Sequence, residues 1–163
     1  MALSPEIMEL ATEVVATLRQ RKQTLSTAES LTAGALSSAI VSVAGASDVF
    51  VGGITAYKDE IKISHLGVEP SMIAKHSSMS QQVAVAMAKG AITSFGTTWA
   101  IATTGVAGPN PLNGFPVGAV WVAIEGPYSQ SVELSLSGER ESIRNASSAS
   151  AIATFARILR ELS

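Results

Sequence analysis

The fold is decided by residues 97–105, TTWAIATTG, which form an almost unbroken apolar run. A strand that is apolar on both faces is typical of the interior of an α/β sheet, where helices cover the sheet from both sides. The run ends in a Thr and Gly turn, which is the usual place for ligand contacts in such folds. Residues 97–105 therefore indicate a buried strand that leads into a functional loop.

Helical and strand-like patterns alternate on both sides of this run. Ser4 and Pro5 suit the start of the first helix, and Ser80 suits the start of another. The predicted helices cover residues 5–22, 31–45, 70–75, 80–95 and 139–162, and the charged segment 58–68 is expected to contain one or two helical turns. The predicted strands cover residues 24–30, 49–57, 97–105, 116–126 and 131–138. We therefore predict one α/β domain over residues 1–163, a three-layer α/β/α sandwich with a mixed, mostly parallel sheet.

Composition excludes several classes of protein. Of 163 residues, 47% are hydrophobic and 15% are charged, and the net charge is −2, which disfavours a nucleic-acid partner. The absence of cysteine excludes disulfides and thiolate zinc sites, and the two histidines, His65 and His76, cannot form a metal site of several imidazoles. Residues 1–10, MALSPEIMEL, lack the charged start and the apolar block that are typical of a signal peptide, and the sequence has no apolar run of the ~20 residues that a membrane span needs. We expect a cytosolic protein.

Residues 27–34, TAESLTAG, are the first candidate for chemistry. A predicted strand ends and a predicted helix begins here, so free backbone N–H groups near Leu31 to Gly34 would stabilise an anion or an oxyanion. Ser30 lies at the junction, among small neighbours. The alternative is that Ser30 or Thr32 only caps the helix.

Residues 54–62, ITAYKDEIK, are the second candidate. Lys58 and Lys62 are one helical turn apart, and like charge together with partial burial would lower the pKa of Lys62 far enough for it to act as a base. Asp59, three residues before Lys62, opposes this change because its carboxylate would favour the charged form of the lysine. The alternative is a solvated charged turn, in which Tyr57 simply packs instead of donating a hydrogen bond.

Two further segments have ligand-binding features. In residues 102–109, ATTGVAGP, glycines allow a substrate to approach a strand end closely, although a plain exit into a loop is equally compatible. In residues 138–144, GERESIR, Arg140 and Arg144 lie one turn apart near a helix N-terminus. A bound anion such as a phosphate would explain two cations at this position, because both guanidinium groups could bind it. The alternative is that the two arginines form surface ion pairs with Glu139 and Glu141.

Taken in order, these motifs resemble one known family. TAESLTAG, GGITAYKDEIKISHLGV, ATTGVAGP, PVGAVWVAI and GERESIR together are similar to the C-terminal domain family of the competence/damage-inducible protein CinA, from about Glu9 to Leu159. The resemblance implies an amidohydrolase that converts nicotinamide mononucleotide to nicotinate mononucleotide and ammonia, with no metal and no cofactor. The expected partner is a small-molecule nucleotide, and we expect a homo-oligomer.

The resemblance also implies roles for individual residues. It makes Ser30 the nucleophile and Lys62 its base, with Tyr57 as a third catalytic residue. The substrate-binding residues that we expect are Leu31, Thr32, Gly34, Thr104, Gly105, Arg140 and Arg144. The two arginines would hold the 5′-phosphate.

The chain departs from the family pattern in three places. Ala33 stands in a segment that usually reads Cys-Thr-Gly-Gly, and this matters if the position needs a positive φ. Residues 77–79 replace Gly-Ala-Val, and residues 110–114 replace a glycine run. Phe115 stands where a lysine or a similar residue is often found, and we expect this loop to border the substrate. These departures leave a second hypothesis open, namely a catalytically silent nucleotide-binding or regulatory module of the same fold.

Overall fold

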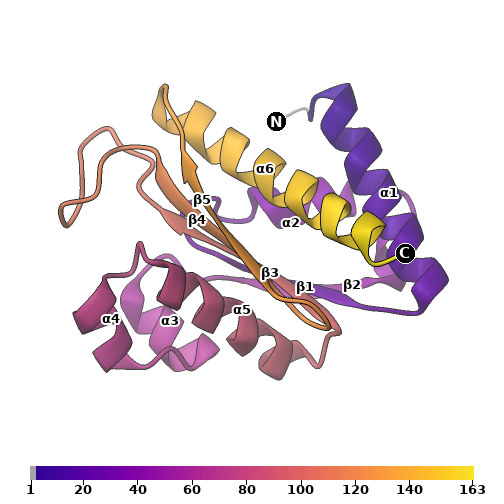
Figure 1. The fold of residues 1–163 in the computed structure, drawn as a ribbon, viewed down its shortest axis with the longest axis horizontal. Coiled ribbons are helices and arrows are strands. Elements are labelled where there is room, and N and C mark those ends of the chain that lie inside the picture. The colour runs from indigo at the N-terminus through magenta and orange to yellow at the C-terminus, as the bar shows by residue number, and fades with distance from the viewer. Residues whose placement is uncertain (1–2) are drawn as a thin grey trace.

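A five-stranded mixed sheet forms the middle of the structure, a computed structural model that describes residues 3–163 (Figure 1). The strands are β1 (Leu25–Glu29), β2 (Phe50–Thr55), β3 (Trp99–Gly105), β4 (Ala119–Glu125) and β5 (Gln130–Ser135). They lie in the order β2-β1-β3-β4-β5, with β1 parallel to β2 and β3, and with β4 antiparallel to both of its neighbours. Because β4 runs against the other four, the predicted mixed, mostly parallel sheet is confirmed.

Helices cover both faces of this sheet. They are α1 (Pro5–Arg21), α2 (Ala35–Val41), α3 (Asp59–Leu66), α4 (Pro70–His76), α5 (Gln81–Phe95) and α6 (Arg140–Glu161), with a short 3-10 helix, η1, at Ala46–Asp48. Helices α1, α2 and α6 lie over one face, and α3, α4 and α5 lie over the other (Figure 1). The predicted three-layer sandwich is confirmed. No helix within residues 3–163 has both the length and the apolar character that crossing a lipid bilayer requires.

Strand β3 is buried on both faces because its side chains alternate between two cores. Trp99 and Ile101 belong to the core under α1, α2 and α6, where the Trp99 ring meets the edge of Phe155 at a centroid distance of 5.3 Å. Ala100 and Ala102 belong to the other core, under α5. The apolar run at residues 97–105 thus predicted both the strand and its burial.

The expected helix caps are present. The Ser4 hydroxyl accepts the N–H of Ile7 at 3.3 Å at the start of α1, and the Ser80 hydroxyl accepts the N–H of Val83 at 3.3 Å at the start of α5. The short helices expected after residue 58 and at Pro70 are α3 and α4. These local signals act within a few residues, so the sequence predicts them directly.

The second helix is much shorter than the prediction of residues 31–45. It covers Ala35–Val41, and residues 31–34 form a turn instead. The reason is backbone conformation, because Ala33 has a φ of 47° and Gly34 a φ of 95°, neither of which fits a right-handed helix. The nucleophile candidate therefore lies on a turn of several residues between strand and helix.

The glycine pair of β2, Gly52 and Gly53, lies against side chains of neighbouring elements. A Cβ at Gly52 would meet the Phe95 ring at 2.8 Å, and one at Gly53 would collide with the Thr27 hydroxyl. The glycines thus make room for side chains from α5 and β1.

Candidate active site

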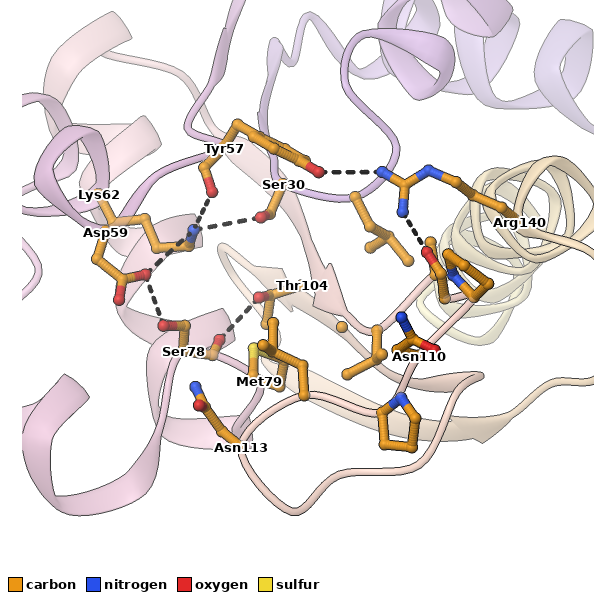
Figure 2. Close-up of a pocket in the computed structure, with 18 residues that line it drawn as sticks. Ser30, Tyr57, Asp59, Lys62, Ser78, Met79, Thr104, Asn110, Asn113 and Arg140 are labelled. Atoms are coloured by element: carbon orange, nitrogen blue, oxygen red, sulfur yellow. Dashed lines mark hydrogen bonds and ion pairs between the residues drawn. The ribbon is translucent and has the colours of Figure 1, made fainter.

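A cavity of about 390 Å³ opens where β1 and β3 end (Figure 2). Ser30 follows β1, Lys62 lies on α3, Gly105 ends β3, and Arg140 begins α6, and all four line the cavity. The carboxyl ends of parallel strands are the usual binding edge of an open α/β sheet. The volume falls in the range of about 300–1,000 Å³ that small-molecule sites occupy, so a mononucleotide is of suitable size.

Ser30 and Lys62 form a close pair inside this cavity. The distance between Ser30 Oγ and Lys62 Nζ is 3.2 Å. The Lys62 amine also donates to the carbonyl oxygens of Ala56 at 2.9 Å and Tyr57 at 3.1 Å. If the amine is neutral, these two carbonyls use its two N–H bonds, which leaves the nitrogen lone pair for the Ser30 hydroxyl.

The environment of Lys62 favours this neutral form. The side chain is 1% exposed, and burial lowers the pKa of Lys62 below its ordinary value, while the nearby Asp59 carboxylate opposes the change by a smaller amount. Lys58, expected to contribute through like charge, is exposed at the N-cap of α3. Burial is therefore the cause of the lowered pKa, and the alternative of a solvated charged turn does not describe Lys62.

The main chain fixes Ser30 at the end of β1. Its N–H donates to the carbonyl of Thr103 at 2.9 Å, and its own carbonyl accepts the N–H of Ala33 at 3.1 Å, which closes the turn. Ser30 is 7% exposed, so its hydroxyl is reached only through the cavity. Strand and turn together give the hydroxyl a defined position beside the amine.

Glu29 is a supporting residue that the sequence analysis missed. Its buried carboxylate accepts hydrogen bonds from three backbone N–H groups and two hydroxyls at the start of α2. The donors are the N–H groups of Gly34, Leu36 and Ser37 and the hydroxyls of Thr32 and Ser37, at 2.6–3.1 Å. The available signal was an acidic residue near the end of an otherwise uncharged predicted strand, just before a predicted helix.

This arrangement determines which backbone donors remain available near Ser30. We expected free N–H groups from Leu31 to Gly34, but the N–H of Gly34 is bonded to Glu29 at 3.0 Å. Within residues 3–163, the N–H groups of Leu31 and Thr32 have no hydrogen-bond acceptor. These two follow the nucleophile candidate directly, as oxyanion donors often do.

Tyr57 and Arg140 form a bridge at the mouth of the cavity (Figure 2). Arg140 Nη2 donates to the Tyr57 hydroxyl at 3.0 Å, and Arg140 Nη1 donates to the carbonyl of Gly108 at 2.5 Å. Tyr57 is 56% exposed, so its ring lies at the entrance rather than beside Ser30. The bridge joins the β2–α3 connection, the loop after β3 and the start of α6.

A second group of polar contacts lies opposite this bridge. The Ser78 hydroxyl donates to Asp59 Oδ1 at 2.5 Å, and the same oxygen lies 3.7 Å from Lys62 Nζ. The Thr104 hydroxyl donates to the carbonyl of Ser78 at 2.7 Å, so Thr104 lines the cavity but is engaged in holding its wall. Asp59 and Ser78 are cavity residues that we had not assigned to the site.

Three predicted substrate contacts lie outside this cavity. Thr32 and Gly34 contact Glu29, as described above. Arg144 donates to the carbonyls of Leu31 at 2.8 Å and Thr32 at 3.2 Å from behind the turn, where it lines a separate cavity. The structure thus brings together Ser30, Leu31, Tyr57, Lys62, Thr104, Gly105 and Arg140.

The segments that depart from the family pattern form one wall of the site. Ser78, Met79 and residues 110–113 line the cavity, while Ser77 and Phe115 line a neighbouring one that shares Asp59, Ser78 and Asn113. Ala33 does adopt a positive φ, the case in which its substitution for glycine matters. His76 lines the neighbouring cavity and His65 bonds Ser64. Across residues 3–163, no three His, Cys, Asp or Glu side chains are grouped so that they could hold a metal ion.

Comparison with known proteins gives matches of one description, over most of the chain. A family model described as the CinA C-terminal domain matches residues 7–159. A CinA-like protein of Frankia casuarinae is 41% identical over 149 residues, which cover 90% of this chain and 34% of that protein. A CinA-like protein of Thermotoga neapolitana is 38% identical over 151 residues, 91% of this chain and 36% of that protein. The chain thus spans about a third of the length of these curated relatives.

Solved structures agree with the sequence comparison. The competence/damage-inducible protein CihA of Agrobacterium tumefaciens superposes with a TM-score of 0.92 and 31% identity, covering 98% of this chain and 99% of that one. The competence damage-inducible protein A of Klebsiella pneumoniae superposes with a TM-score of 0.93 and 30% identity, covering 96% and 99%. These two solved chains match the chain over nearly their full lengths.

Proposed function

Because the chain belongs to the CinA C-terminal domain family, we propose that it is an amidohydrolase that converts nicotinamide mononucleotide to nicotinate mononucleotide and ammonia. The observation that carries this proposal is the 3.2 Å contact between Ser30 Oγ and the amine of Lys62, a lysine that is 1% exposed. A buried amine with a lowered pKa beside a hydroxyl is the arrangement that a lysine base requires.

In the proposed acylation step, neutral Lys62 removes the proton of Ser30 as Oγ attacks the carboxamide carbon. The resulting oxyanion accepts hydrogen bonds from the N–H groups of Leu31 and Thr32, which have no other acceptor among residues 3–163. The carbon–nitrogen bond then breaks, and Lys62 passes its proton to the leaving nitrogen. Ammonia departs and an acyl ester on Ser30 remains.

The proposed deacylation step reverses these roles. Water attacks the acyl carbon while Lys62 accepts a proton from it, the ester bond to Ser30 Oγ breaks, and the proton returns to that oxygen. Nicotinate mononucleotide forms as the carboxylic acid, which gives its proton to the released ammonia or to water and leaves as the carboxylate. No metal or cofactor takes part in either step of this proposal.

The two arginines have separate roles in the proposal. Arg140 lies in the cavity and would exchange its bonds to Tyr57 and Gly108 for the substrate phosphate. Arg144 bonds the carbonyls of Leu31 and Thr32, and we assign it to holding the turn that contains the oxyanion donors. Tyr57 at the entrance would then contact the substrate rather than the reacting carbon.

An ammonia-release assay with three amides tests the proposal. Nicotinamide mononucleotide, nicotinamide riboside and free nicotinamide share the carboxamide but differ in ribose and phosphate, so their relative kcat/KM values also show whether a phosphate is needed. Ser30→Ala and Lys62→Gln should each lower kcat by about 10³ or more, because each removes half of a coupled pair. Exposed Ser38→Ala on α2 and Lys58→Gln at the start of α3 are matched controls, expected to retain activity.

The outcomes separate the two hypotheses for this site. Thermal stabilisation by nicotinamide mononucleotide without ammonia release would identify a silent nucleotide-binding module and exclude the hydrolase. Full activity in either the Ser30 or the Lys62 variant would remove that residue from the mechanism.

A further inference from the structure

Asp59 Oδ1 lies between a hydroxyl donor and the amine of the proposed base. Ser78 Oγ donates to it at 2.5 Å, whereas the distance from Oδ1 to Lys62 Nζ is 3.7 Å, beyond hydrogen-bond range (Figure 2). The Asp59 side chain is 50% exposed and the Lys62 side chain 1%. The carboxylate therefore has freedom to move, while the amine is fixed by the carbonyls of Ala56 and Tyr57.

The backbone that carries Ser78 is itself held firmly. The Thr104 hydroxyl, at the end of β3, donates to the Ser78 carbonyl at 2.7 Å. On either side, the N–H of Ser77 donates to the Ile73 carbonyl at 2.9 Å, and Ser80 caps α5. The donor to Asp59 is thus fixed to the sheet and to two helices, so its position is set independently of α3.

We propose that Ser78 is a positioning residue, whose hydroxyl holds the Asp59 carboxylate just out of hydrogen-bond reach of Lys62 and so keeps the amine lone pair for Ser30. This role in catalysis rests on the proposed function. The resemblance leads us to expect alanine at position 78. Alanine has no hydroxyl, so the hydrogen bond from position 78 to Asp59 is specific to this chain's own sequence.

The effect of Ser78 depends on whether the Asp59 carboxylate stays at its present distance from Lys62 or closes on the amine. A carboxylate that closed on the amine would stabilise the ammonium form, which has no lone pair with which to take the Ser30 proton. Shortening 3.7 Å to a contact of about 2.8 Å, at an effective dielectric of about 20, strengthens the attraction by roughly the free energy of one pH unit. Donation by Ser78 also offsets part of the carboxylate's charge, and this acts in the same direction.

Other ionisable groups around this site do not substitute for Asp59. Those on neighbouring elements are Glu29, Tyr57, Lys75, His76, Lys89 and Arg140. Tyr57 and Arg140 line the cavity but bond each other, and the Glu29 carboxylate is used by the start of α2. Lys75 and His76 line the next cavity, which Asp59 also borders, and Lys89 is exposed beside the other end of α3. The other charged residues near the start of α3, Lys58 and Glu60, are exposed.

The titration of Lys62 can be followed directly by NMR. The chain contains five lysines, so carbon-13 labelling at lysine Cε gives few signals, and Lys62→Met assigns the relevant one. Ser78→Ala should raise the titration midpoint of Lys62 by about one pH unit. Asp59→Asn should lower it by more than that, because the whole attraction at 3.7 Å is about three times the change that closing the gap would add. Ser78→Thr, which keeps the hydroxyl, should leave the midpoint near that of the unchanged protein.

The decisive measurement is the titration of the double variant that combines Ser78→Ala with Asp59→Asn. In an Asp59→Asn background, Ser78→Ala should no longer move the midpoint, because the carboxylate on which it acts is absent. An unchanged or lowered midpoint in Ser78→Ala, or an equal shift in both backgrounds, would overturn the proposal. Since Ser78 is buried, Ser78→Cys, of similar size but a weak donor, provides a second variant if the alanine variant does not fold.

Enzyme kinetics then separate this inference from the proposed function. If nicotinamide mononucleotide is hydrolysed, the acid limb of kcat/KM against pH should move with the NMR midpoint in each variant. If none of the three amides releases ammonia, the proposed function fails, and the NMR titration still decides whether Ser78 controls the Asp59–Lys62 contact.

Discussion

Replacing Ser77 by glycine is expected to stabilise the protein. Ser77 follows α4 with a φ of 71° and a ψ of 155°, a backbone region that side chains other than glycine rarely adopt. Its own hydroxyl offers little compensation, since it lies 3.5 Å from the N–H of Met79, at the limit of a hydrogen bond. The family pattern has glycine here, and the observed backbone angles give the physical reason.

The expected gain follows from two opposing terms. A residue in such a region costs about 1–3 kcal/mol, and glycine relieves that cost. Glycine also adds freedom to the unfolded chain, which costs about 0.4–1 kcal/mol. The net increase in the free energy of unfolding is about 1 kcal/mol, which raises Tm by about 2–4 °C for a chain of this size.

Thermal and chemical denaturation followed by circular dichroism would measure the change. Gly67→Ser is the reverse control, because Gly67 ends α3 with a φ of 67° and has no atom within 4 Å of an added Cβ. Serine there should lower Tm by backbone strain alone. A Ser77→Gly variant with an unchanged or lower Tm, alongside a destabilised Gly67→Ser variant, would refute the strain argument at position 77.

Three other substitutions probe the site. Burial lowers the folded-state pKa of Lys62 below its unfolded value. At pH values between these two, the unfolded chain binds more protons than the folded one. The free energy of unfolding therefore rises with pH there, by at most about 1.4 kcal/mol per pH unit. Lys62→Met should flatten this rise in urea denaturation at a series of alkaline pH values, and identical slopes would contradict the assignment. Glu29→Ala should lower the free energy of unfolding by about 3 kcal/mol, because five donors lose a buried acceptor, whereas exposed Glu60→Ala should change it by less than about 0.5 kcal/mol. Tyr57→Phe should change KM for nicotinamide mononucleotide more than kcat, since it releases Arg140 and leaves the reacting pair intact; a large loss of kcat alone would assign Tyr57 to the chemistry.

Features set by local sequence were predictable. The apolar run of β3, the serine caps of α1 and α5, and the sequence of strands and helices follow from periodicity and capping within a few residues. Ser30 and Lys62 were found through the order of several motifs, and the structure places their side chains in contact. The burial of Lys62 was expected in part, although like charge from Lys58 was not the cause.

Features set by contacts between distant segments were not predictable. The predicted start of α2 was wrong because Ala33 takes a positive φ, which the glycine of the family pattern indicates at this position but an alanine by itself does not. Arg144 was assigned to a ligand because nothing local shows that its partners are the carbonyls of Leu31 and Thr32, more than a hundred residues earlier. The contact of Ser78 with Asp59 likewise depends on how α3 and the start of α5 are packed together.

The packing of α1 and α6 in one core has a consequence for how the chain folds during synthesis. Helices α1 and α6 lie over the same face of the sheet (Figure 1). On α1, Val14, Val15 and Leu18 are buried in the same core as residues of α6, and Arg140 of the cavity belongs to α6. During synthesis α1 leaves the ribosome before α6, so the part of this apolar stripe that α6 covers stays exposed until α6 emerges. A nascent chain therefore has neither a complete core on the α1 side of the sheet nor a complete cavity until α6 docks.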